Sequence, residues 1–123
     1  MPESFFTSFR HACRGLWTVF RDEKNFRLQT LAGSCAIGSG LFFGIGKTEW
    51  FFLLFVIALV LLLEIANTFL ERILDLVKPR LHPQVHDLKD MLAGAVLLAA
   101  MLSLVVGFWI FGSRIWEIVV GKV

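Results

Sequence analysis

Charge is absent from three long stretches of this sequence. Residues 28–46, 50–63 and 91–113 contain no Asp, Glu, Lys or Arg. Hydrophobic residues make up 57% of the 123-residue chain, and its mean hydropathy is +0.74. An ordinary soluble domain is only about 45–50% apolar, so this composition excludes that class and predicts a small integral membrane protein.

Cysteine is also scarce, with two residues in the chain. The two cysteines, Cys13 and Cys35, have no metal-ligand spacing, and we interpret them as buried or interfacial free thiols rather than as a disulfide.

Residues 44–48 read Gly-Ile-Gly-Lys-Thr, which is similar to the end of a nucleotide-binding loop. Leu41 stands where that loop needs its first glycine, so we discount the match.

The uncharged runs predict an all-α membrane protein. A helix needs about 20 residues to cross the hydrocarbon core, and the first and third runs reach that length. The second run reaches it only if the helix continues beyond residue 63 with an amphipathic pattern. Pro83 suits the first turn of the helix that follows. The predicted transmembrane helices are residues 28–46, 50–77 and 83–113.

An amphipathic helix is predicted at the amino-terminal end of the chain. Across residues 4–21 the apolar side chains share one arc, and Arg10, Arg14 and Arg21 lie at its edge. This pattern is typical of a helix that lies in the membrane interface while its arginines reach the lipid phosphates. The whole chain, residues 1–123, is then one integral membrane domain, with no sign of a cleavable signal peptide or of a nucleic-acid partner.

Basic residues are unevenly distributed between the two sides of the predicted membrane. Nine of the twelve Lys and Arg residues precede the first transmembrane helix or surround the loop after the second one. The positive-inside rule therefore places the amino terminus and the loop around residues 78–90 in the cytoplasm.

Four polar side chains share one stripe of the second predicted transmembrane helix. At about 100° per residue, Glu64, Asn67, Glu71 and Asp75 lie within about 80° of one another. An ionisable group at bilayer depth costs about 3 kcal/mol or more, so it is rarely present without a polar partner, an ion or a substrate. This stripe is the candidate functional site.

The start of the third predicted transmembrane helix adds a lysine to these carboxylates. Lys89 and Asp90 follow His82 and His86, and the two histidines have no third zinc ligand nearby. Carboxylates that share a divalent ion beside a lysine favour a magnesium-phosphate site. Phosphoryl transfer needs positioning, metal charge compensation and a base, and these residues can supply all three.

Two other functions remain open on the residues alone. The acidic stripe could serve a small carrier for protons or cations. The chain could instead be a non-catalytic assembly protein, because small residues at regular spacing let helices approach closely. Such residues form stripes in the first and third predicted transmembrane helices: Gly33, Ala36, Gly40, Gly44, Ala100, Ser103 and Gly107.

Several motifs together resemble the signature of the prokaryotic diacylglycerol kinase family. They are residues 64–75 (Glu-Ile-Ala-Asn-Thr-Phe-Leu-Glu-Arg-Ile-Leu-Asp), His82-Pro83, Lys89-Asp90, residues 93–96 (Ala-Gly-Ala-Val), Gly15, Glu23 and Asn25-Phe26. The resemblance covers nearly the whole chain. The segment from His82-Pro83 to residue 96 is more similar to the undecaprenol kinase branch of Gram-positive bacteria than to the enteric diacylglycerol kinase branch.

This resemblance implies a homotrimeric enzyme of the bacterial inner membrane that transfers the γ-phosphate of Mg-ATP to a lipid alcohol. Undecaprenol is the first substrate that it implies, and diacylglycerol is the alternative. Glu64 matches the general base, and Glu23 and Glu71 match the carboxylates that bind Mg²⁺. The positions that match nucleotide contacts, or polar positions of the same site, are Lys89, Asp90, His82, Asn67 and Asp75. The enteric branch has a nucleotide-binding arginine where this chain has Ser4; the candidates to replace it are Arg10, His11 and Arg14.

Overall fold

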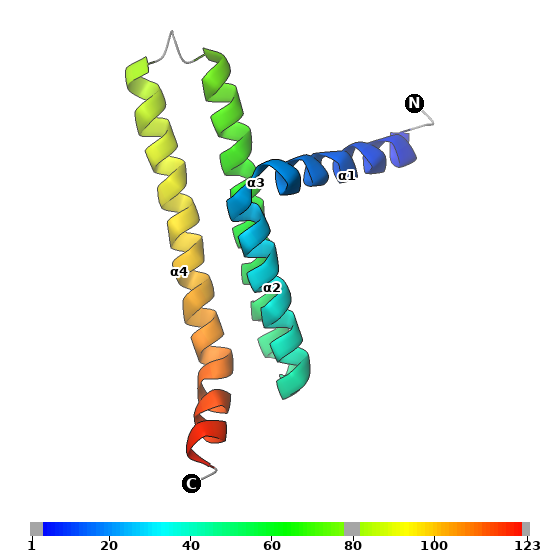
Figure 1. Ribbon diagram of the computed structural model, residues 1–123, viewed down its shortest axis with the longest axis vertical. Helices are drawn as coiled ribbons and strands as arrows, with labels where there is room; N and C mark the ends of the chain where they lie inside the picture. Colours follow the sequence, from blue (N-terminus) through cyan, green and yellow to red (C-terminus); the bar gives the residue numbers. More distant parts are fainter. Residues whose placement is uncertain (1–3, 78–81, 122–123) are drawn as a thin grey trace.

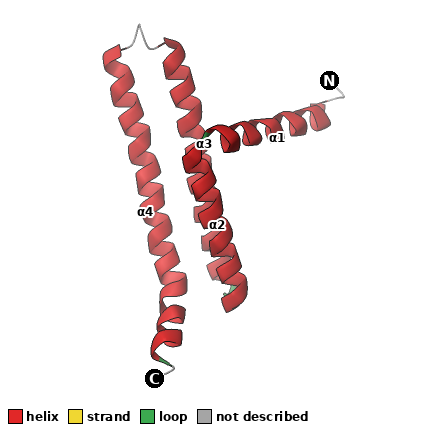
Figure 2. Ribbon diagram, viewed as in Figure 1, coloured by secondary structure: helices red, strands yellow, loops and turns green. Residues whose placement is uncertain are grey.

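The structure is a computed structural model that describes residues 4–77 and 82–121, with the side chain of His82 outside the description. The described part is all-helical, as predicted, and Figure 2 shows only short loops between helices. Four helices follow one another along the chain: α1 (Ser4–Asp22), α2 (Lys24–Phe43), α3 (Lys47–Val77) and α4 (His82–Val120).

Three of the helices run along one another, while the first leaves the bundle sideways (Figure 1). α3 packs most extensively against α4, and α2 packs along α3. The direction of the chain reverses between α2 and α3 and again between α3 and α4 (Figure 1). The junction of α1 with α2 therefore lies beside α3, well before that helix ends.

Small residues bring α2 close to α3, which confirms the contact predicted for the glycine stripe. A Cβ atom at Gly33 would lie 3.0 Å from the side chain of Ile57, and one at Gly40 would lie 2.9 Å from the indole of Trp50. Gly44 ends α2 with a positive φ of 63°, a conformation that glycine adopts without strain.

An ion pair connects α3 to α4 at the end of the bundle away from α1. Nη1 and Nη2 of Arg114 donate to the two carboxylate oxygens of Glu49 at 2.6 and 2.8 Å. Glu49 also accepts a hydrogen bond from the backbone N–H of Gly46, the residue before α3. The third transmembrane helix was predicted to end at residue 113, where the uncharged run ends, but α4 continues past Arg114 to Val120. The pairing of Arg114 with Glu49 accounts for this difference.

Two of the described helices, α3 and α4, are long and apolar enough to cross a membrane. α2, which was predicted to be a third crossing, does not meet the same measure of length and hydropathy. Its sequence includes Lys24, Arg27 and several small polar residues, which lower its hydropathy. Many large apolar side chains of the bundle are exposed in the single chain, including Phe42 (78% exposed) and Phe108 (81%). Such a surface is suited to lipid or to another protein chain.

Both cysteines are free thiols, as predicted, but neither is buried, because both are exposed in the single chain.

Candidate functional site

Glu23 occupies the one non-helical position between α1 and α2. Its backbone is extended (φ −112°, ψ 113°), and its side chain stands at the N-cap of α2 without making a capping hydrogen bond. The backbone is held on both sides, because the N–H of Glu23 donates to the carbonyl of Val19 at 2.8 Å and the N–H of Arg27 donates to the carbonyl of Glu23 at 3.2 Å. The sequence predicted helices over residues 4–21 and 28–46, but α1 ends at Asp22 and α2 begins at Lys24, so the break between them is Glu23 alone.

The stripe on α3 changes from buried to exposed along its length. Glu64 is only 6% exposed, and Thr68, one turn further, is 4% exposed. Glu71 is half-buried and accepts a hydrogen bond from Nδ2 of Asn67 at 3.4 Å, whereas Asp75 is exposed. The stripe covers about 16 Å of helix, so it leads from a buried carboxylate to the solvent-exposed end of α3.

Three of the predicted site residues come together where α1 and α2 meet α3. The side chains of Glu23 and Glu71 lie within electrostatic reach of the Glu64 carboxylate. Among the ion pairs of the described residues, none involves Glu23, Glu64 or Glu71. Like charges this close repel one another, so the arrangement favours a bound cation.

The donor set fits Mg²⁺ better than a metal held by protein alone. Within residues 4–77 and 82–121, no three His, Cys, Asp or Glu side chains are placed to hold a metal ion by themselves. Mg²⁺ in phosphoryl-transfer sites usually takes one or two carboxylates, with phosphate and water oxygens completing its shell. Glu23 and Glu71 could supply those two carboxylates.

Two of the predicted nucleotide contacts, Asp75 and Lys89, meet between the C-terminal end of α3 and the N-terminal end of α4, whereas Asn67 lies beside Glu71. Nζ of Lys89 lies 3.5 Å from Oδ1 of Asp75 and so joins the two helices. Asp90 pairs instead within α4, where its Oδ2 lies 3.0 Å from Nδ1 of His86. The side chain of His82, another predicted nucleotide contact, lies outside the described residues.

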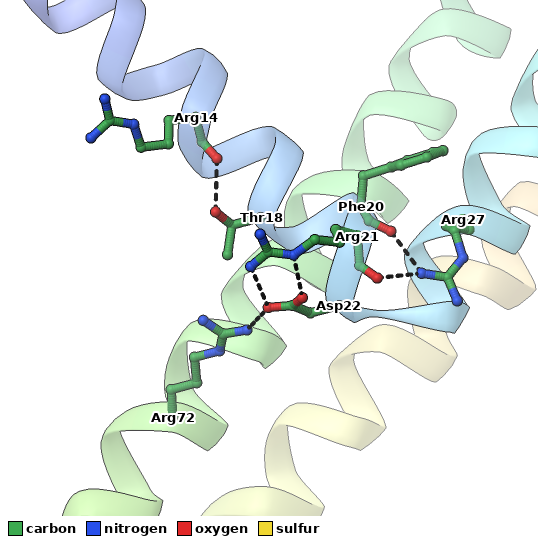
Figure 3. A network of polar contacts seen from close by, with 7 residues as sticks. All are labelled: Arg14, Thr18, Phe20, Arg21, Asp22, Arg27 and Arg72. Carbon is green, nitrogen blue, oxygen red and sulfur yellow. Dashed lines mark hydrogen bonds and ion pairs between the residues drawn. The ribbon is translucent and has the colours of Figure 1, made fainter.

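A network of charged residues that the sequence reasoning missed surrounds the Glu23 junction (Figure 3). Oδ2 of Asp22 accepts a hydrogen bond from Nη2 of Arg72 on α3 at 2.7 Å, and Oδ1 of Asp22 accepts one from Nε of Arg21 at 2.8 Å. These hydrogen bonds, from Arg21 first and then Arg72, lower the pKa of Asp22 from 3.8 to about 2. Because the pKa is lowered, the carboxylate stays ionised further into the acid range than an ordinary aspartate, and the pairing is lost only as the pH falls through about 2.

Arg27 completes this network from the first turn of α2. Its Nη1 donates to the backbone carbonyls of Phe20 at 2.9 Å and Arg21 at 2.7 Å, which belong to the last turn of α1 (Figure 3). These carbonyls have no partner within the helix, so the arginine caps α1 and restrains its angle to α2. The only signal in the sequence was a cluster of charges around residues 21–27, which resembles an ordinary solvated linker.

Two apolar grooves lie between the helices, and one of them reaches the candidate site at Thr68. One, of about 520 Å³, lies between α1 and α3 and is lined by Gly15, Leu16, Val19, Ile65, Thr68 and Phe69, with Arg72 also in its wall. The other, of about 360 Å³, lies between α2, α3 and α4, where Gly33 and Ala36 face Ser103 and Gly107. Members of both predicted small-residue stripes therefore line one groove.

These features define a small helical membrane protein with an acidic site at the side of an apolar helix. Comparison with known proteins is more specific. The family model described as prokaryotic diacylglycerol kinase matches residues 10–111. The undecaprenol kinase of Bacillus subtilis (strain 168) is 36% identical over 107 residues, which cover 87% of each chain. The diacylglycerol kinase of Synechocystis sp. (strain PCC 6803) is 37% identical over 101 residues, which cover 81% of this chain and 58% of that protein. No solved structure matches the chain.

The chain belongs to the prokaryotic diacylglycerol kinase family, which confirms the resemblance seen in its motifs. It is a lipid kinase, a phosphotransferase that uses ATP and has an alcohol group as acceptor. Membership also identifies it as a membrane protein, in agreement with its two long apolar helices.

Proposed function

We propose that this lipid kinase phosphorylates undecaprenol and produces undecaprenyl phosphate. The observation that carries the proposal is the buried Glu64 with the charges of Glu23 and Glu71 beside it. The choice of lipid is supported by the similarity to the Bacillus subtilis undecaprenol kinase, which covers 87% of both chains.

In this reaction the role of each site residue follows from its depth along the α3 stripe. Glu64 accepts the proton of the lipid hydroxyl while the hydroxyl oxygen bonds to the γ-phosphorus, and the bond to the bridging oxygen of ADP breaks. Glu23 and Glu71 would hold Mg²⁺, which would supply positive charge to neutralise the phosphate oxygens. The nucleotide approaches from the exposed end of the stripe, where we place its contacts with Asp75, His82, Lys89 and Asp90, and Asn67 reaches it from the turn between Glu64 and Glu71.

The same proposal includes a membrane arrangement. α2, α3 and α4 cross the bacterial inner membrane, α1 lies in its interface, and the amino terminus and active site face the cytoplasm. Nine of the twelve basic residues lie on that side, which supports the orientation. A homotrimer would cover part of the large apolar surface that a single chain exposes, including Phe42 and Phe108.

The choice between lipids can be tested directly with purified protein. We expect labelled ATP and Mg²⁺ to phosphorylate undecaprenol at least about tenfold faster than diacylglycerol in the same detergent. The Synechocystis relative makes diacylglycerol the alternative, and a faster rate on that lipid would replace our choice. Absence of labelled lipid with either alcohol would contradict the proposed reaction, and ion transport without nucleotide would favour a carrier.

Lys89→Ala is expected to raise the KM for ATP about tenfold, with a smaller effect on kcat. A hydrogen bond to a charged group is worth about 1.5–3 kcal/mol, and the lysine would make such a bond to a phosphate oxygen. Titration of ATP at saturating lipid measures the effect. Lys47→Ala is the matched control, because Lys47 is an exposed lysine at the opposite end of α3. An unchanged dependence on ATP concentration in Lys89→Ala would remove Lys89 from the nucleotide site.

A further inference from the structure

The ion pair between Asp22 and Arg72 joins the immediate neighbours of two candidate metal ligands. Asp22 precedes Glu23 at the end of α1, and Arg72 follows Glu71 on α3. The pair closes at 2.7 Å between residues that are 50 positions apart in the chain. Figure 3 shows Arg72 reaching from α3 to the carboxylate of Asp22, which Arg21 holds from the other side.

We infer that Asp22 and Arg72 are positioning residues whose ion pair sets the separation between the carboxylates of Glu23 and Glu71. The inference rests on the proposed function, because it assigns a purpose to the pair only if Glu23 and Glu71 bind one metal ion. Neither Asp22 nor Arg72 touches the substrate in this role.

Electrostatics explains why the two carboxylates need such a connection. The negative charges of Glu23 and Glu71 each act on the Glu64 carboxylate, so before a cation binds the repulsion between Glu23 and Glu64 pushes the α1–α2 junction away from α3. The Asp22–Arg72 pair pulls the same junction toward α3. Arg27 keeps the end of α1 fixed to α2, so the position of Asp22 determines the position of Glu23.

Stability alone is a poor explanation of this pair. The side chains of Arg72 and Asp22 are 54% and 32% exposed, and ion pairs that are open to water contribute little to folding. The connection between helices has no substitute among the other contacts of Asp22. Arg21 is its neighbour in sequence, so the Arg21–Asp22 pair holds nothing on α3.

Metal binding without turnover tests the inference. Mn²⁺ replaces Mg²⁺ as the probe, and its binding is followed by electron paramagnetic resonance with a non-hydrolysable ATP analogue and no lipid alcohol. We expect Arg72→Ala and Asp22→Ala each to weaken Mn²⁺ binding about 10–100-fold, the range for residues that orient metal ligands. The double variant should be no weaker than either single one, because both remove the same contact.

Two further variants separate positioning from a general loss of charge or of structure. Arg21→Ala removes a partner of Asp22 but leaves α1 joined to α3, so Mn²⁺ binding should change by less than about twofold. Arg72→Lys keeps a cation opposite Asp22 and should restore most of the affinity lost in Arg72→Ala. The KM for the lipid alcohol should be the same in all four single variants.

The inference is overturned if Arg72→Ala binds Mn²⁺ as tightly as the parent protein, or if Arg21→Ala is impaired to the same extent. These results leave the proposed function intact if the parent still phosphorylates lipid. A parent that binds Mn²⁺ but transfers no phosphate contradicts the proposed function alone. A parent that binds no Mn²⁺ overturns both.

Discussion

Glu64→Gln is expected to lower kcat by about 10²–10⁴-fold, the range that a positioned general base contributes. The amide has nearly the shape of the carboxylate but cannot accept the proton of the attacking hydroxyl. Because Glu64 is only 6% exposed, water cannot easily take over that task. Rates of labelled phosphate transfer at saturating ATP and lipid measure the effect, while the oligomeric state and the KM for ATP should stay close to those of the parent.

Two measurements distinguish loss of the base from other effects of this substitution. The charge of Glu64 lies within reach of Glu23 and Glu71, so its removal also changes the electrostatics of the metal site. If Mn²⁺ binds the variant normally while transfer is slow, proton acceptance is what was lost. Glu117→Gln is the matched control, since Glu117 is an exposed carboxylate at the far end of α4. Normal turnover by Glu64→Gln would rule out its role as the base.

The sequence predicted the helices because their signal is local. The uncharged runs and the amphipathic period that follows them indicate helices wherever they occur, and Pro83 marks the start of the last one. The ends of the helices depend on distant contacts and were less well predicted. No pattern near residue 113 shows that Arg114 will pair with Glu49, 65 positions earlier, and that α4 will therefore continue to Val120.

The residues of the candidate site also differ in how well the sequence predicted them. Glu64, Asn67 and Glu71 lie on a single helix, so the helical period alone predicts that they share a face. Glu23 lies on another part of the chain and was identified only through the family resemblance. The contact between Asp22 and Arg72 could not be predicted, because it depends on the angle at which α1 leaves α2 and on the position of that junction along α3.

The metal site can be tested on the same helix with a substitution that preserves shape. Glu71→Gln removes the charge but keeps an oxygen that can accept the hydrogen bond now made by Asn67. Because it removes a direct ligand, we expect the Mg²⁺ concentration needed for half-maximal activity to rise by more than about 100-fold, the upper end of the range for residues that only orient ligands. Mn²⁺ should restore part of the activity, because it accepts the same kinds of oxygen ligand as Mg²⁺.

Asp75→Asn is the control that decides whether this effect belongs to Glu71 or to any acid on the stripe. Asp75 lies one turn beyond Glu71 but is exposed and paired with Lys89, so its loss should alter the dependence on ATP far more than the dependence on Mg²⁺. If both variants need equally more Mg²⁺, the stripe attracts the cation only through its total charge. If only Glu71→Gln does, the ion is held at the level where the Glu23 junction meets α3, between the buried base and the exposed nucleotide contacts.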